Sequence, residues 1–122
     1  MILADTSVWI DHLRSANPQL RQLLHRGEIA IHPFIVAELA LGSLKNRAAT
    51  LALLDLLPHV SIAQLGEVRN MVETRHLYNL GIGLTDAHLI ASIFLSRSTL
   101  LWTNDKHLRK AAAALGIHVS FA

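Results

Sequence analysis

The sequence contains no cysteine, few aromatic residues (5%) and few charged residues (16%). The absence of cysteine excludes disulfide frameworks, thiolate zinc sites and cysteine nucleophiles. Apolar residues make up 52% of the 122 positions, which is typical of a folded core and untypical of disordered segments. We expect a single domain over residues 1–122. We expect a chain with this apolar content to leave some apolar surface exposed. We therefore expect a homodimer, in which a second copy covers that surface.

Long hydrophobic runs are also missing. Met1 to Ala4 leads directly into Asp5, without the basic start and apolar core of a secretion signal. No stretch reaches the roughly 18 apolar residues that a membrane span needs. We therefore expect a cytoplasmic protein. The 11 Lys and Arg residues outnumber the 9 Asp and Glu residues. If several carboxylates converge in one pocket, the remaining surface is basic, which favours nucleic acid as a partner.

Apolar periodicity and capping residues predict strands that alternate with helices. Because each predicted strand is apolar throughout, we expect an α/β fold, a three-layer α/β/α sandwich with a mainly parallel central sheet. Ligands in such folds bind beyond the carboxyl ends of the strands. The predicted strands are 2–4, 28–32, 60–62, 99–103 and 117–121, and the predicted helices are 8–13, 18–24, 33–41, 47–57, 65–78, 87–95 and 106–114.

Four carboxylates are candidates for a site in this fold. Asp5 and Asp105 each follow a predicted strand, whereas Glu38 and Asp86 belong to helical segments. Taken singly, each of the three aspartates is equally well explained as a helix cap. Glu38 lies inside an apolar helix, where capping does not explain it, although a solvated stripe would. Asp55 also lies among leucines, and we assign it to a solvated helix face.

Four carboxylates in one place raise each other's pKa unless a cation neutralises them. Mg²⁺ or Mn²⁺ suits such a site, because these ions prefer oxygen ligands and keep several bound waters. One of those waters can be activated to attack a phosphodiester. The carboxylates therefore favour phosphoryl chemistry over other reaction classes.

Four motifs occur in order along nearly the whole chain: residues 5–11 (DTSVWID), 38–42 (ELALG), 86–92 (DAHLIAS) and 102–105 (WTND). Each motif is a weak signal alone, but their order and spacing together form a specific pattern. In this pattern the sequence resembles the PIN-domain ribonucleases, most closely the VapC toxins of bacterial toxin-antitoxin pairs. The resemblance implies a PIN-like fold and an endoribonuclease activity.

Carried over residue by residue, the resemblance implies an acidic pocket with Asp5 and Asp86 as direct metal ligands. Glu38 and Asp105 would bind the ion directly or through water. Hydroxyl or amide groups next to the motifs would orient these carboxylates, although turn and cap chemistry explains them equally well. These groups belong to Thr6, Ser7, Thr103 and Asn104. Lys106 and His107 stand where some family members carry a further acid, so a fifth carboxylate is not expected.

The resemblance also implies a mechanism and partners. A metal-activated water would attack RNA in line and leave a 5′-phosphate and a 3′-hydroxyl, with Mg²⁺ or Mn²⁺ as cofactor. A cognate VapB-type antitoxin would bind the toxin and place a basic side chain in the acidic pocket.

Several residues near the motifs have two interpretations each. Arg14, Lys45 and Arg47 are candidates to bind the RNA backbone, and solvated helix faces explain them equally well. Trp9 could stack on a base, but its apolar helix favours a core or dimer contact. His88 and His107 are better explained by packing or surface roles than by catalysis.

Two other enzyme or signalling classes place an aspartate after the first strand. Aspartate-based phosphatases need a second aspartate two residues later, where this chain has Ser7. Phosphorylated receiver domains need an acidic pair there and an aspartate near mid-chain, and this pattern is missing. A PIN-like module that binds RNA or an antitoxin without cleaving remains the alternative.

Overall fold

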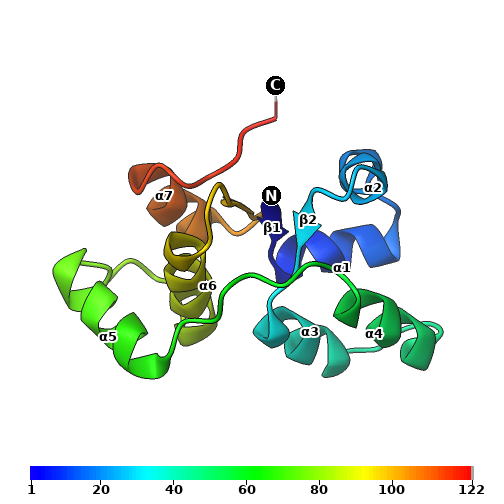
Figure 1. Cartoon of the computed structure of the whole chain (residues 1–122), viewed down its shortest axis with the longest axis horizontal. Coiled ribbons are helices and arrows are strands. Elements are labelled where there is room, and N and C mark those ends of the chain that lie inside the picture. The colour runs from blue at the N-terminus through cyan, green and yellow to red at the C-terminus, as the bar shows by residue number, and fades with distance from the viewer. Residues whose placement is uncertain (122) are drawn as a thin grey trace.

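The computed structural model describes residues 1–121 and is built around a small parallel sheet (Figure 1). Its strands are β1 (Ile2–Ala4), β2 (Ile29–Ala30) and β3 (Leu100–Trp102), in the order β2-β1-β3. Both neighbours pair with β1 in parallel, with Ile2 opposite Ile29 on one side and Leu100 on the other. The prediction of a parallel α/β fold is confirmed.

The helices form two groups beside the sheet. In Figure 1, α1 to α4 lie on the right of β1 and α5 to α7 lie on the left, with the green chain between α4 and α5 crossing from one group to the other. The helices are α1 (Thr6–Arg14), α2 (Pro18–His25), α3 (Pro33–Ala40), α4 (Arg47–Asp55), α5 (Leu65–Thr74), α6 (Leu84–Leu95) and α7 (Lys106–Ala114).

Side-chain caps begin the helices that follow the strands. The carboxylates of Asp5 and Asp105 accept hydrogen bonds from Val8 N–H (3.2 Å) and Leu108 N–H (2.8 Å), and so cap α1 and α7. Asn17 caps α2 ahead of Pro18, as the sequence predicts. Each cap satisfies an N–H group that the first helical turn leaves without a partner. The ends of β1 and β3 are thereby fixed to the helices that follow them.

Two predicted strands are wrong. Residues 60–62 form no strand, because the chain pairs with the sheet only at the bridge between Ile31 and His59 and then turns toward α6. Residues 117–121 pair only through the bridge between Leu101 and His118. Beyond that bridge Phe121 packs edge-on against Trp102, with ring centroids 4.7 Å apart. Both segments border the sheet without extending it.

Some predicted boundaries also need correction. Strand 28–32 is reduced to Ile29–Ala30, because His32 already caps α3. Predicted helix 65–78 ends at Thr74, and His76 just beyond it has a left-handed φ of 54°. Predicted helix 87–95 begins three residues earlier, at Leu84, which places Asp86 inside the first helical turn. Among residues 1–121, no helix combines the length and the hydropathy needed to cross a bilayer.

Candidate active site

Two of the four predicted acids, Asp5 and Asp105, follow neighbouring strands of the sheet. Ala4 at the end of β1 pairs with Trp102 at the end of β3, and Asp5 N–H donates to the Trp102 carbonyl at 3.0 Å. The chain therefore delivers Asp5 and residues 103–105 to the same edge of the sheet. In parallel sheets this carboxyl edge is where ligands bind.

The Asp5 carboxylate is buried and held by three donors. Its Oδ1 accepts the Ser7 hydroxyl and Val8 N–H, and its Oδ2 accepts the Thr103 hydroxyl. The side chain is only 5% exposed. Burial raises the pKa of Asp5, and the hydrogen bonds from Ser7 and Thr103 lower it in part. Burial is the larger cause, so this carboxylate is ionised at a cost in free energy.

Hydroxyl groups connect the ends of β1 and β3. The Ser7 hydroxyl donates to Asp5 and accepts Asn104 N–H at 3.0 Å. The Thr103 hydroxyl also donates to Asp5, and it accepts Asp105 N–H at 3.0 Å. Asn104 thus takes part through its backbone, where the sequence suggested its side-chain amide. These bonds fix the orientation of Asp5 relative to the start of α7.

The other two acids come from helices that lie apart along the chain. Glu38, on α3, is exposed, and its Oε1 accepts the Thr6 hydroxyl from the first residue of α1. Asp86 is the third residue of α6, and its Oδ2 accepts Gly83 N–H at 3.2 Å in a capping box. Each of these carboxylates therefore has one oxygen fixed by a hydrogen bond.

The pKa of Asp86 is affected by the charges of the other three acids. Burial is the largest cause that raises its pKa, and the negative charges of Asp105, Asp5 and Glu38 raise it further, while the bond from Gly83 lowers it. Like charges have this effect only over short distances. The charges of three acids from separate segments therefore act on Asp86.

The arrangement does not form a closed metal cage. Within residues 1–121, no three His, Asp or Glu side chains are close enough together to hold one ion. Oδ1 of Asp86, Oε2 of Glu38 and Oδ2 of Asp105 accept no hydrogen bond from the described residues, so these oxygens are available to a cation or to its waters. Mg²⁺ in proteins is commonly held by one or two carboxylates and several waters. The donor chemistry thus fits such an ion.

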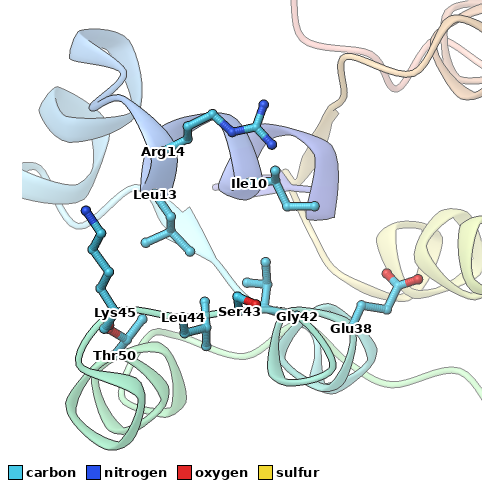
Figure 2. Close-up of a pocket in the computed structure, with 10 residues that line it drawn as sticks. Ile10, Leu13, Arg14, Glu38, Gly42, Ser43, Leu44, Lys45 and Thr50 are labelled. Atoms are coloured by element: carbon cyan, nitrogen blue, oxygen red, sulfur yellow. The ribbon is translucent and has the colours of Figure 1, made fainter.

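A groove of about 490 Å³ extends from Glu38 between α1 and the α3–α4 region. Figure 2 shows Glu38 at one end, Lys45 at the other, and Arg14 on the opposite wall. The groove is mostly apolar between these charged groups, and its other lining residues are Ile10, Leu13, Leu39, Gly42, Ser43, Leu44 and Thr50.

Other predicted residues have specific places. The Arg47 guanidinium donates to the carbonyls of Gly42 (3.2 Å) and Ala40, at the C-terminal end of α3. Trp9 is buried, as its apolar helix predicts, and so is not free to stack on a base.

Both histidines near the motifs make packing contacts. His88 is buried and packs on Phe34, with ring centroids 4.6 Å apart. The His107 ring lies against Gly81, where an added Cβ would come within 3.0 Å of its Nδ1.

Sequence reasoning missed His32 and the apolar lining of the groove. His32 is completely buried and caps α3, although histidine is not among the usual capping residues. Its place directly before a helix-initiating proline was the available signal. The groove residue Leu13 belongs to α1 and Leu44 to the segment between α3 and α4, and no local pattern relates them.

The chain belongs to the PIN-domain family, whose sequence profile matches residues 2–114. It is also 44% identical over 117 residues to Ribonuclease VapC32 of Mycobacterium tuberculosis, from strain CDC 1551 / Oshkosh and from strain ATCC 25618 / H37Rv. These alignments cover 96% of this chain and 94% of each relative. The resemblance drawn from the four motifs is confirmed.

Proposed function

We propose that this chain is the ribonuclease toxin of a toxin-antitoxin pair, an endonuclease that hydrolyses RNA with Mg²⁺ or Mn²⁺. The observation that carries the proposal is the effect of three acids on the fourth: the charges of Asp105, Asp5 and Glu38 all raise the pKa of Asp86. A purely structural set of helix caps has no reason to gather its charges at one place, because their repulsion costs free energy. A site that binds a cation does.

The proposed roles are those that the resemblance to the PIN-domain ribonucleases implies. Asp5 and Asp86 would be the direct ligands, and Glu38 and Asp105 would bind the ion or its waters. A divalent ion bound there would neutralise the carboxylates and lower the pKa of a bound water, which suits hydrolysis to a 5′-phosphate and a 3′-hydroxyl. Ser7 and Thr103 hold Asp5 in one orientation, and Thr6 does the same for Glu38.

The RNA backbone would follow the groove that starts at Glu38. Arg14 and Lys45 place positive charges on its walls, and such cations attract phosphates without reading sequence. Arg47 is a weaker candidate for this role, because its guanidinium already binds two carbonyl groups of its own chain.

The similarity to VapC32 of Mycobacterium tuberculosis, whose name describes a ribonuclease, supports this proposal. By the same analogy we propose a VapB-type antitoxin as partner and action on RNA in the cytoplasm. We also keep the homodimer as a prediction. Exposed leucines support it, since Leu41 and Leu56 are 88% and 80% exposed.

The test is RNA cleavage by the purified full chain in Mg²⁺ or Mn²⁺. Asp5→Asn and Asp86→Asn should each lower kcat/KM by more than about 100-fold, because the loss of even an outer-shell partner costs about 10- to 100-fold. Asp55→Asn is the matched control, since Asp55 is exposed on α4 and is not among the charges that act on Asp86. Circular dichroism should show folded protein in all three variants.

Two outcomes contradict the proposal in different ways. Equal cleavage by wild type, Asp5→Asn and Asp86→Asn would mean that the acids are not the active site. Tight binding of RNA or antitoxin by a wild-type chain that does not cleave in either metal would favour the alternative, a PIN-like binding module without catalytic activity.

A further inference from the structure

A buried histidine joins the two helices that carry the helix-borne acids. The His32 side chain is completely buried, its Nδ1 accepts Phe34 N–H at 3.0 Å, and its Nε2 lies 3.1 Å from the Ser92 hydroxyl. The first contact caps α3, and the second reaches across to α6. One imidazole ring therefore satisfies the start of α3 and binds α6 at the same time.

The hydrogen bonds define the state of this ring. Because Nδ1 accepts an N–H group, it carries no proton, and the proton of the neutral ring is on Nε2 and points to Ser92. Burial, and then the neighbouring His88 and His59, lower the pKa of His32 to about 4. The ring is therefore neutral near pH 7, and the tautomer is fixed.

Ser92 extends the contact to a third segment. Its hydroxyl also accepts Ala63 N–H at 3.2 Å, from the chain that crosses between the two helix groups. Beside this network, Phe34 of α3 packs against His88 of α6 at 4.6 Å between ring centroids. The start of α3, the middle of α6 and the crossing segment are thus held together by one polar network and one aromatic contact.

The same face of α3 carries Glu38. Phe34 and Glu38 are four residues apart, so they lie one turn from each other on one side of the helix. The contact between Phe34 and His88 therefore makes the side of α3 that carries Glu38 face α6. Asp86 lies two residues before His88 on α6. A shift of α3 against α6 would change the separation of these two acids directly.

We propose that His32 is a positioning residue that sets the separation of Glu38 from Asp86 by tying the start of α3 to Ser92. The inference rests on the proposed nuclease function. Ser, Thr, Asp or Asn would cap α3 equally well, but their short side chains could not also span the distance to α6. The imidazole is the one neutral side chain with an acceptor and a donor on opposite edges of a rigid ring.

Two variants break the bond to α6 from either end. In His32→Asn the amide oxygen can still cap α3 but does not reach Ser92, and in Ser92→Ala the cap is untouched. Both should lower kcat by about tenfold or more, because small misplacement of catalytic groups is costly. Both should also weaken Mn²⁺ binding, measured by titration calorimetry without RNA. Asn17→Ala is the matched control: it removes the cap of α2, which carries none of the four acids.

Double variants separate positioning from general stability. If His32 acts through Glu38, His32→Asn should change kcat and Mn²⁺ affinity less than about twofold in a Glu38→Gln background. A decrease of the same size in both backgrounds would overturn the inference, and so would wild-type kcat and Mn²⁺ affinity in folded His32→Asn and Ser92→Ala. An equal decrease in Asn17→Ala would also overturn it.

The Mn²⁺ arm also separates this inference from the proposed function. If the wild-type chain cuts no RNA, the proposed function fails. The Mn²⁺ affinities of the single and double variants then decide the role of His32 by themselves. Long-range ¹H–¹⁵N spectra provide a further check on the folded wild type, and a proton found on Nδ1 of His32 would contradict the hydrogen-bond arrangement on which the inference stands.

Discussion

The four acids reach the carboxyl edge of the sheet by two routes, which differ in how firmly they fix a side chain. Asp5 and Asp105 follow paired strands, and the hydroxyls of Ser7 and Thr103 connect them to each other's segments. Glu38 and Asp86 come from helices and each accept one hydrogen bond. The strand-held pair is therefore fixed by the sheet, whereas the helix-borne pair depends on how α3 and α6 pack.

This difference matters for function because, of the four acids, only the helix-borne Glu38 lines the groove. Glu38 ends the groove that Arg14 and Lys45 border, and Asp5 takes no part in its lining. We infer that the strand-held pair provides the fixed reference of the site. The helix-borne pair is the part that substrate, partner or mutation can move.

The largest effect should come from the hydroxyl that holds the strand-held pair. Thr103→Val removes a donor to buried Asp5 and the acceptor of Asp105 N–H. We expect kcat to fall by about 100-fold, against about tenfold for Thr6→Val, which frees only Glu38. Single-turnover cleavage at saturating Mg²⁺ measures both. Equal losses would show that the two routes do not differ in the way described.

The contact between Gly81, in the segment before α6, and the His107 ring can be tested by substitutions at two glycines. Gly81 and Gly27 both have left-handed φ angles, +74° and +68°, but only at Gly81 would a Cβ meet a neighbour, the His107 ring at 3.0 Å. Gly27→Ala should cost about 1 kcal/mol, for the backbone conformation alone. Gly81→Ala should lower the free energy of unfolding by about 2 kcal/mol. Its cleavage rate should also fall, because the segment that leads into α6 and Asp86 would shift. Urea unfolding measures the two costs, and equal values would mean that His107 moves aside freely.

The sequence could predict the position of the strand-held pair of acids but not the position of the helix-borne pair, for a physical reason. The strand-held pair could be placed, because an apolar strand followed by a capping aspartate specifies both the sheet edge and the helix start. The motifs identified Glu38 and Asp86 as candidate site residues. The distance between these two acids, however, depends on contacts such as the one between His32 and Ser92, which lie 60 positions apart in the sequence. Strands 60–62 and 117–121 were wrong for a related reason: a strand needs a partner of sufficient length, and β-propensity alone does not reveal one.

The groove should affect binding more than chemistry. Arg14→Gln with Lys45→Gln should raise KM for RNA by about tenfold with kcat nearly unchanged, and should reduce the slope of log affinity against log salt by about 1 for each charge removed. Arg47→Gln is the contrasting variant. Since its guanidinium binds carbonyls at the end of α3, it should lower stability and leave the salt slope unchanged. Fluorescence anisotropy with a labelled RNA at several salt concentrations distinguishes these outcomes.

The smallest effect expected is a gain in stability at the site itself. Burial and three neighbouring negative charges raise the pKa of Asp86, so the folded state binds a proton more tightly than the unfolded state does. The free energy of unfolding therefore falls as pH rises from the ordinary aspartate value of 3.8 through the raised pKa, and the penalty is complete above that raised pKa. Asp86→Asn should remove the penalty and raise stability at pH 7 by about 1 kcal/mol or less, since the side chain is partly exposed and solvent screens its charge. The gain should vanish well below pH 3.8, where both chains carry a neutral side chain at this position.

Urea unfolding at pH 7 and at low pH measures the difference in stability. Asp55→Asn, on an exposed helix face, should show no such difference. A loss of stability in Asp86→Asn at pH 7 would mean that its bond to Gly83 outweighs the repulsion, and that the helix-borne acid is held as firmly as the strand-held pair.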